Sequence, residues 1–306
     1  MSAEPKPPFA AVLAAFAALY LIWGSTYLGI RFAIETLPPF TMAGVRFLIA
    51  GAVMYAWQRP RHAAPTRRHW RTAGIVGAFL LLGGNGGVTW AEQIVPSGVA
   101  ALLVASTPMW MVVLDAARPG GTRPGWGVVA GLAVGLAGIV WLVGPSELGG
   151  EPVPLVGALA VLGAALSWAT GSIYQRGAPQ SEATLLNVAM QMLAGGALLL
   201  TVGVGLGERV DLAAVSGRSL GALVYLIVFG ALVGYSAYVW LLKVTTPAQV
   251  STYAYVNPVV AVILGWALAG EPLGPRVLGA GAAVVLAVAL ITTARAPARA
   301  TEPARE

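Results

Sequence analysis

The stretch FAAVLAAFAALYLIWGSTYLGI, from Phe9 to Ile30, contains no charged residue over 22 positions. As an α-helix it would extend about 33 Å, enough to cross the roughly 30 Å hydrocarbon core of a bilayer. Nine further apolar stretches follow, each bounded by charge or proline: Phe40–Trp57, Thr72–Ala91, Gly98–Ala117, Gly125–Gly144, Leu155–Gln175, Thr184–Leu206, Leu220–Leu242, Ala248–Gly270 and Gly274–Ala294. The sequence therefore predicts ten transmembrane segments.

The composition supports the same class. The chain is 58% hydrophobic and only 10% charged, with a mean hydropathy of +0.78, which leaves too few polar residues to cover a soluble globule of 306 residues. Backbone groups cannot face lipid unpaired, so spans are helices or the strands of a closed barrel. The apolar stretches lack the alternation of barrel strands, and an all-α integral membrane protein is predicted.

Cysteine and histidine are nearly absent. The chain has no cysteine, and its two histidines, His62 and His69, lie in one basic loop. Disulfides and thiolate metal sites are therefore excluded, and neither a metal nor a cofactor is expected. No convincing cleavage signal accompanies the first apolar stretch between Lys6 and Arg31, so we interpret it as a retained span.

The basic residues are distributed unequally between the two faces of the membrane. With loops assigned to alternate faces, four of the 18 lie on one face (Arg31, Arg209, Arg218 and Arg276) and thirteen on the other: Lys6, Arg59, Arg61, Arg67, Arg68, Arg71, Arg118, Arg123, Arg176, Lys243, Arg295, Arg299 and Arg305. The positive-inside rule places both termini in the cytoplasm. The cluster around Arg59–Arg71 sets topology or binds anionic lipid; no nucleic-acid partner is expected.

Two internal similarities divide the chain into halves. The segment from Leu21 to Arg31 resembles that from Leu166 to Arg176, with Trp and Arg repeated at a shift of 145. Ser106–Trp110 resembles Val256–Val260 at a shift of 150. Residues 1–145 and 152–294 then form two five-helix repeats, and an odd number of spans makes the second repeat inverted. Residues 295–306 are expected to be a disordered cytoplasmic tail.

These pieces resemble the EamA family of the drug/metabolite transporter superfamily. The matching residues include Trp23-Gly24-Ser25, Arg46-Phe47, Pro108, Asn257-Pro258 and Gly270-Glu271-Pro272, in the order and spacing of the family. The resemblance implies ten helices, cytoplasmic termini, a central cavity formed by both halves, and export of small metabolites, often amino acids. One departure is the missing glutamate after the fourth span, where the sequence reads DAARPGG from Asp115.

Arg46 is the basic residue that lies well inside a span, about six residues and about 9 Å from its end. A charge there costs about 2.5 to 3.5 kcal/mol on insertion scales, so a compensating interaction is expected. Either the guanidinium faces a cavity and binds a substrate carboxylate, or it reaches the interface or backbone carbonyls and stabilises packing. The sequence is compatible with both interpretations.

Two prolines lie in the middle of corresponding spans. Pro108 and Pro258 each remove a backbone hydrogen bond, and matched interruptions of this kind indicate a binding site or its gate. The alternative is a kink that only shapes packing. The run Gly83–Gly87 in the third span likewise serves either close helix packing or a cavity wall that presents Asn85.

Polar and aromatic residues of the spans make up the predicted substrate site. Hydroxyl, amide and guanidinium groups would bind a small zwitterion, and the rings would contact its apolar or aromatic side chain. The residues are Trp23, Ser25, Arg46, Asn85, Trp168, Asn187, Gln191, Ser251, Tyr253, Tyr255 and Asn257. For the aromatic residues, interface anchoring or core packing is the alternative.

Acidic residues are absent from the centres of the spans. Glu92, Asp115 and Glu271 all lie at span ends, whereas a proton or sodium carrier is expected to have a carboxylate at membrane depth. We therefore expect a facilitator or a weakly coupled exporter, in which Glu92 is the first candidate for a coupling residue.

The function favoured by the sequence is a secondary carrier that exports small metabolites, foremost amino acids with aromatic or apolar side chains, across the inner membrane by alternating access. The alternative is a multidrug efflux transporter for lipophilic compounds. An enzyme is not expected, because no His, Cys or paired-carboxylate group lies at membrane depth. The expected partners are a small-molecule substrate and the bilayer, with the chain a monomer or a homodimer.

Overall fold

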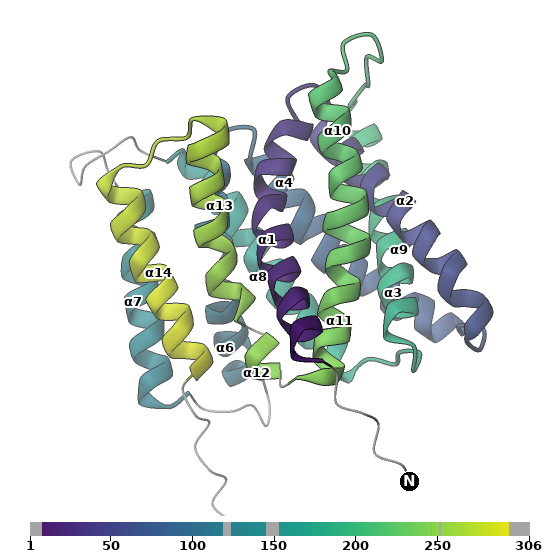
Figure 1. Ribbon diagram of the computed structural model, residues 1–306, viewed down its shortest axis with the longest axis horizontal. Coiled ribbons are helices and arrows are strands. Elements are labelled where there is room, and N and C mark those ends of the chain that lie inside the picture. Colours follow the sequence, from purple (N-terminus) through teal and green to yellow (C-terminus); the bar gives the residue numbers. More distant parts are fainter. Residues whose placement is uncertain (1–7, 119–123, 145–152, 246, 251, 294–306) are drawn as a thin grey trace, which may run out of the picture.

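The computed structural model describes residues 8–118, 124–144, 153–245, 247–250 and 252–293, and these contain helices and no strand. Nine helical spans in these ranges are long and apolar enough to cross a membrane (Figure 1). At the place of the expected ninth span, Ala248–Gly270, lies a shorter apolar helix, Tyr253–Ala269. The prediction of an all-α membrane protein is confirmed, and the predicted tail 295–306 lies outside the described residues.

The first half contains five spans in the order that the sequence predicts. They are α1 (Phe9–Ala33); α2 (Pro39–Gln58), followed by the short η1 (Arg59–Arg61); a continuous span of α3 (Arg67–Gly77), η2 (Ala78–Gly86) and α4 (Gly87–Ala91); a broken span of α5 (Ser97–Val104) and α6 (Thr107–Ala117); and α7 (Trp126–Val143). Proline and hydroxyl residues begin several of them. Pro39 occupies the first turn of α2, and the Thr66 hydroxyl accepts from the His69 amide at the start of α3.

The second half repeats this organisation. It contains α8 (Leu155–Gly177); α9 (Thr184–Gly205); a continuous span of α10 (Gly217–Tyr225), η4 (Leu226–Val233) and α11 (Gly234–Val244); a broken span of α12 (Pro247–Val250) and α13 (Tyr253–Ala269); and α14 (Pro275–Thr293). Both η2 and η4 are π-helical and lie in the middle of the third span of their half. The third and fourth spans therefore share their irregularities between halves.

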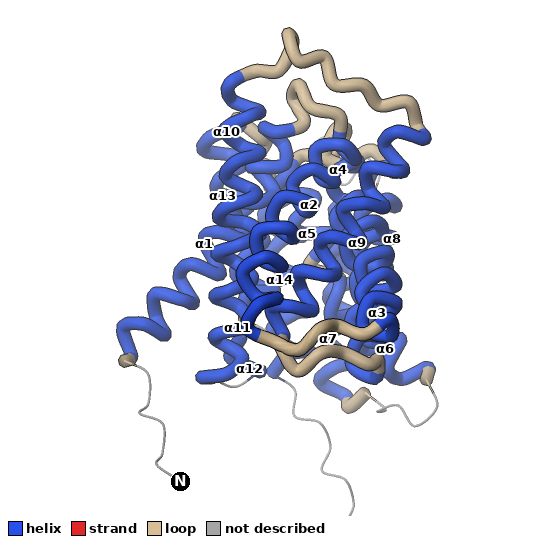
Figure 2. The backbone as a smooth tube through the Cα atoms, turned by 90° about the vertical axis from the view of Figure 1, so that its right-hand side faces the viewer, coloured by secondary structure: helices blue, strands red, loops and turns tan. Residues whose placement is uncertain are grey.

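The two ends of the bundle differ in what they contain. Helix α1 begins and α14 ends at the same end, which we call the termini side; the opposite end is the far side (Figures 1 and 2). The loops that precede α2, α5 and α10 lie at the far side, and α8 begins there. The cytoplasmic location of the termini stays a prediction.

Helix packing separates two groups around a centre. Helix α1 contacts α10, η4, α11 and α13, and we call these the α1 group. Helix α8 makes the corresponding contacts with α3, η2, α4, α5 and α6, which form the α8 group. Helix α2 packs against α9, and α7 against α14, at the flanks. Helices α1 and α8 thus have corresponding partners, each packing against the third and fourth spans of the other half.

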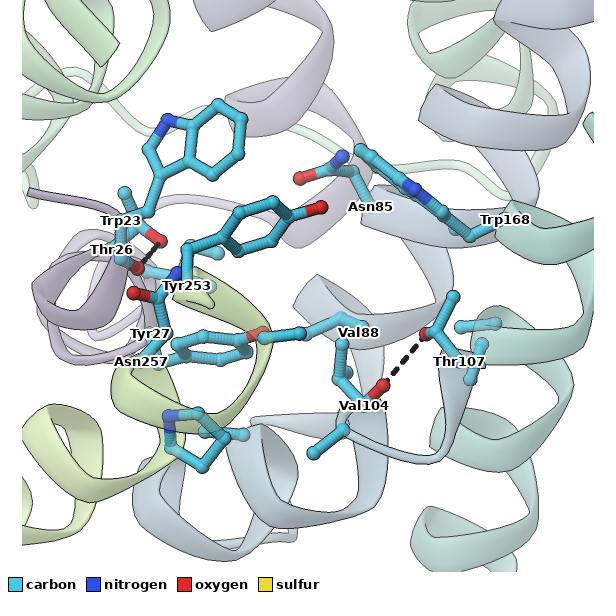
Figure 3. Close-up of a pocket in the computed structure, with 18 of the residues that line it drawn as sticks. Trp23, Thr26, Tyr27, Asn85, Val88, Val104, Thr107, Trp168, Tyr253 and Asn257 are labelled. Carbon is cyan, nitrogen blue, oxygen red and sulfur yellow. Dashed lines mark hydrogen bonds between the residues drawn. The ribbon is translucent and has the colours of Figure 1, made fainter. Parts of the chain in front are cut away.

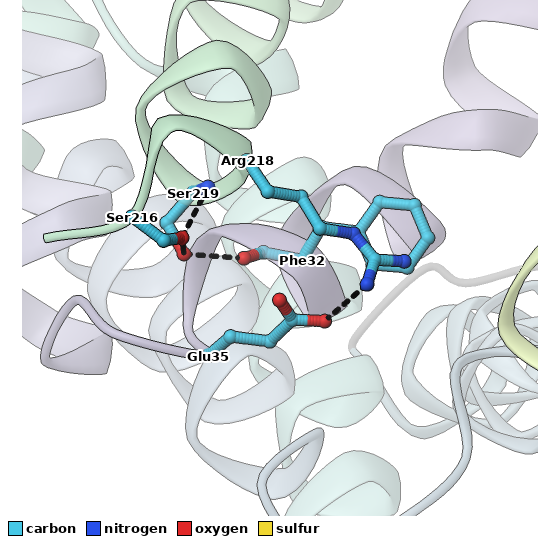
Figure 4. A network of polar contacts seen from close by, with 5 residues as sticks. All are labelled: Phe32, Glu35, Ser216, Arg218 and Ser219. Carbon is cyan, nitrogen blue, oxygen red and sulfur yellow. Dashed lines mark hydrogen bonds and ion pairs between the residues drawn. The ribbon is translucent and has the colours of Figure 1, made fainter.

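Polar contacts hold the α1 group together at the far side. The Ser219 hydroxyl donates to the Phe32 carbonyl at 2.8 Å, and Arg218 pairs with Glu35 at 3.3 Å (Figure 4). The Arg218 guanidinium also lies over the Phe32 ring, 3.7 Å from its centroid. These contacts tie the end of α1 to the start of α10, so the two helices form one unit there.

Two further contacts join the groups to each other at the far side. Gly270 ends α13 in a left-handed conformation, with φ of 66°, and this turn directs Glu271 back towards the start of α5. The Glu271 carboxylate accepts from the Ser97 amide at 2.7 Å and the Gly98 amide at 2.9 Å. Arg31 donates from Nη1 to the Glu92 carbonyl at 2.6 Å. The far side of the bundle is thereby closed.

Replacing Glu271 by alanine should lower the free energy of unfolding by about 1 to 3 kcal/mol, because two backbone amides at the start of α5 lose a charged acceptor. The measurement is thermal or denaturant unfolding of the purified protein in detergent. Glu35→Ala is the matched control, since it removes an exposed carboxylate whose ion pair contributes at most about 1 kcal/mol. Equal effects of the two substitutions would contradict the assignment of Glu271 as the helix cap.

Candidate substrate cavity

A cavity of about 310 Å³ lies between the α1 group and the α8 group, and both halves of the chain line it. Its walls come from α1, α2, η2, α4, α5, α6, α8, η4, α11, α13 and α14. The lining extends to Thr292, the residue before the end of α14, and thus towards the termini side. Because the far side is closed by Glu271 and Arg31, the cavity points to the termini side.

Aromatic rings form part of its walls. The Trp23 ring lies 5.2 Å from Tyr253 and 5.3 Å from Tyr235, both in edge-to-face arrangement. The Trp23 indole nitrogen also donates to the Gly230 carbonyl of η4 at 3.2 Å. The aromatic lining residues are Trp23, Tyr27, Phe47, Trp168, Tyr235 and Tyr253. Such walls suit an apolar or aromatic group on the ligand.

The glycine run places η2 directly against α8. A Cβ at Gly84 would lie 2.9 Å from Trp168 Cε3, and one at Gly87 would lie 3.0 Å from the Ala164 Cβ. Gly84 and Asn85 also line the cavity, where Asn85 lies beside Trp168 (Figure 3). The run therefore combines both uses expected from the sequence, close packing and a cavity wall.

Pro108 lies in the first turn of α6, directly after the break between α5 and α6. Because proline has no N–H, the Val104 carbonyl lacks its helical donor, and the Thr107 hydroxyl donates to it instead at 2.6 Å (Figure 3). Pro108 and Thr107 both line the cavity. An interrupted helix therefore borders the cavity, as the sequence predicts for this span.

The structure corrects the position of the second interruption. Helix α13 continues through Pro258, and the fourth span of this half is broken earlier, between the end of α12 at Val250 and the start of α13 at Tyr253. Proline within a helix removes one hydrogen bond but does not require the helix to end. Pro258 nevertheless lines the cavity together with Ala254, whose carbonyl it leaves without the usual donor.

Arg46 is a buried cation in this largely apolar cavity. It is the eighth residue of α2, about 10 Å along the axis from Pro39, and only 4% of its surface is exposed. The guanidinium lies 4.7 Å from the centroid of the Phe47 ring, and among the described residues its Nε has no hydrogen-bond partner. No Asp or Glu is among the described lining residues. Among the described residues, no carboxylate lies within ion-pair distance of this cation.

Asn257 provides the opposite polarity on another wall. It is 7% exposed, and its Oδ1 atom has no hydrogen-bond partner among the described residues. Thr26, beside it in the cavity lining, directs its hydroxyl to the Trp23 carbonyl at 2.6 Å instead (Figure 3). A buried amide oxygen of this kind can accept a hydrogen bond from a ligand.

The structure brings together six of the predicted binding residues: Trp23, Arg46, Asn85, Trp168, Tyr253 and Asn257. Thr26, Tyr27, Thr107 and Tyr235 also line the cavity but were not in the predicted set. Thr26 and Tyr27 belong to the repeated segment that contains Trp23, and Thr107 precedes Pro108, so their motifs were visible in the sequence. The sequence did not show that these side chains point towards the cavity.

Four other predicted residues lie away from the cavity. The Ser25 and Tyr225 hydroxyls form a hydrogen bond of 2.6 Å within the α1 group. Tyr255 packs against a cluster of buried apolar residues. On α9, the Asn187 amide donates to the Ser181 carbonyl at 2.7 Å and Gln191 donates to Gln175 at 3.1 Å. Helix α9 packs against α2, α3 and η2, and none of its residues lines the cavity. Ser251 lies outside the described residues.

Two stretches of the chain, residues 9–144 and 155–293, match the model of the EamA-like transporter family. The chain belongs to this family. It is accordingly a membrane transporter and not an enzyme, as the sequence predicted.

Relatives of known sequence agree with this assignment. The chain is 42% identical to the uncharacterized inner membrane transporter YedA of Escherichia coli K12, over 90% of this chain and 88% of YedA. It is 27% identical to a probable amino-acid metabolite efflux pump of the same strain, over 51% of this chain and 50% of the pump. A solved crystal structure matches with a TM-score of 0.62 at 25% identity, covering 93% of this chain and 97% of the other.

Replacing Gly234 by alanine should destabilise the protein by about 1 to 3 kcal/mol, since the new Cβ would overlap the Trp23 indole and displace it from its place in the cavity wall. Unfolding in detergent measures the loss. Gly221→Ala is the matched control, because no atom lies within 4 Å of a Cβ there. It should be neutral or stabilise by up to about 1 kcal/mol, as expected for alanine in a helix. A Gly234→Ala variant as stable as this control would show that Trp23 is not held against α11.

Proposed function

We propose that this chain is an inner-membrane carrier that exports amino acids with apolar or aromatic side chains. The observation that carries the proposal is Arg46, a buried guanidinium with no carboxylate partner among the described residues, in a cavity walled by aromatic rings. Leaving such a charge inside a membrane protein is costly unless it has a function. A guanidinium binds a carboxylate through two parallel hydrogen bonds, so the carboxylate of an amino acid would compensate it.

The other groups of the cavity fit the rest of an amino acid. The Asn257 Oδ1 atom would accept from the ammonium group, and Trp23, Trp168 and Tyr253 would contact the side chain. A volume of about 310 Å³ is at the small end of ligand cavities, which suits a single small metabolite. The name of the efflux pump among the relatives supports the same class of substrate.

Transport would proceed by alternating access. The α1 and α8 groups are joined at the far side, while the cavity extends towards the termini side. With the termini in the cytoplasm, as the basic residues predict, this conformation is open to the inside. Rocking of the two groups, related by the inverted repeat, would break the far-side contacts and release substrate outside.

Efflux of lipophilic compounds is the second candidate, and the apolar walls of the cavity favour it. Lipophilic cations, however, would be repelled by Arg46 and would meet no acidic residue among the described lining residues. A thermal-shift screen of the purified protein against amino acids and lipophilic cations distinguishes the two, because only one class should raise the unfolding temperature.

Arg46→Gln should weaken binding of phenylalanine by about 10- to 150-fold, the effect of losing about 1.5 to 3 kcal/mol of charged hydrogen bonds. Its folding should be unimpaired, because a buried unpaired charge is removed. Arg209→Gln, a change at an exposed arginine, is the control. The wild type should also prefer phenylalanine to phenylalaninamide, which lacks the carboxylate, and the variant should not. Equal preference by both proteins would remove Arg46 from the carboxylate site.

A further inference from the structure

Glu92 is an acidic side chain buried at the closed end of the bundle. It follows Ala91, the last residue of α4, and none of its surface is exposed. Neither carboxyl oxygen has a hydrogen-bond partner among the described residues, and no described lysine or arginine is within ion-pair distance. Its own backbone carbonyl accepts the Arg31 bond that joins the two groups. Glu92 is thus part of the contact that closes the far side.

The titratable groups that interact electrostatically with the Glu92 carboxyl come from three other elements. They are Tyr27 and Arg31 of α1, Arg46 of α2, and Glu271, which follows α13. Glu271 already uses both oxygens on the α5 amides, and Arg31 uses Nη1 on the Glu92 carbonyl. Burial raises the pKa of Glu92 well above its usual value, and the charge of Glu271 adds to this, whereas Arg31 and Arg46 oppose it. The side chain therefore sits in a place suited to a neutral carboxyl group.

An ionised carboxylate in this position would be buried without a donor, which is strongly unfavourable. We propose that Glu92 is the proton-binding site of the carrier and that its protonation accompanies closure of the far side. This inference rests on the alternating access proposed above. The sequence led us to expect a facilitator or a weakly coupled exporter with Glu92 as the first candidate for a coupling residue, and the proposal gives Glu92 a specific role at the closed end.

The sign of the linkage follows from exposure. When the far side opens, Glu92 meets water and regains the ordinary pKa of a glutamate. In the closed form the pKa of Glu92 stays raised, so low pH stabilises this form relative to the open one. The stabilisation is lost as the pH rises through the raised pKa. Acid in the outer solution would therefore favour closure of the far side, and the proton bound on closure returns to the outer solution when the far side opens again.

A double electron–electron resonance experiment tests the proposal without any substrate. Because the chain has no cysteine, Leu155→Cys and Leu220→Cys can carry the only two spin labels. Both side chains are exposed, at 61% and 53%, and they mark the far-side ends of α8 and α10, one in each group. The distance between the labels is measured in lipid nanodiscs from about pH 5 to about pH 9, a range above the usual carboxyl pKa.

In the parent protein, which carries only the two spin labels, the population with the short distance should fall relative to the population with the long distance, by up to about tenfold per pH unit as pH rises. Glu92→Gln, a neutral mimic of the protonated side chain, should keep the short distance throughout. Glu92→Asp should retain the pH response with a different midpoint. Glu35→Gln, which removes an exposed carboxylate at the same side, should behave as the parent. A pH response that survives in Glu92→Gln, or its absence from the parent, would overturn the proposal.

Infrared difference spectroscopy over the same pH range provides the second measurement. The carboxylic-acid band that disappears with rising pH should be present in the parent and missing in Glu92→Gln; the same band in both would assign the proton to another group. Neither measurement uses a substrate, so loss of amino-acid binding in the screen above would reject the proposed cargo and leave this result standing. Conversely, amino-acid binding without a pH response would reject the proton site and leave the proposed cargo standing.

Discussion

The absence of water from the hydrocarbon core is the constraint on which the rest of this structure depends. Every backbone amide and carbonyl within the membrane needs a partner in the protein, so irregular backbone is tolerated only where it borders a cavity or another helix. The break between α5 and α6, the π-helical segments η2 and η4, and Pro258 all contribute residues to the cavity wall. At Val104, the Thr107 hydroxyl supplies the missing donor. Departures from regular helix and the ligand cavity thus have a common physical origin.

Burial away from water gives several of the charged residues distinct roles. Glu271 and Arg31 are bonded to backbone groups and hold the far side closed. Arg46 is a cation with no described carboxylate partner in the cavity, and Glu92 is a carboxyl group with no described partner in the closed contact. Bonded charges stabilise the conformation, whereas unbonded ones favour a ligand or a proton.

Sequence patterns predicted where most of the helices lie along the chain, but not which side of each helix meets a neighbour or the cavity. Apolar stretches and flanking prolines predicted the spans within a few residues, because lipid imposes a minimum length on each helix. Asn187 and Gln191 show what such patterns omit. They lie four residues apart on α9, yet they bond Ser181 and Gln175, and no residue of α9 lines the cavity. A single sequence does not reveal which face of an apolar helix meets a neighbour.

By itself, the sequence determined that the chain is a helical membrane protein in two similar halves, and it predicted Trp23, Arg46, Trp168 and Asn257 as binding residues. These conclusions follow from composition, length and repetition, which lipid constrains directly. Only the tertiary structure decided that α13 passes unbroken through Pro258, that Glu92 is buried at the closed end, and that these four residues share one cavity. The physical reason is that burial and pairing depend on how the helices cross, and helix crossings arise from contacts between distant residues.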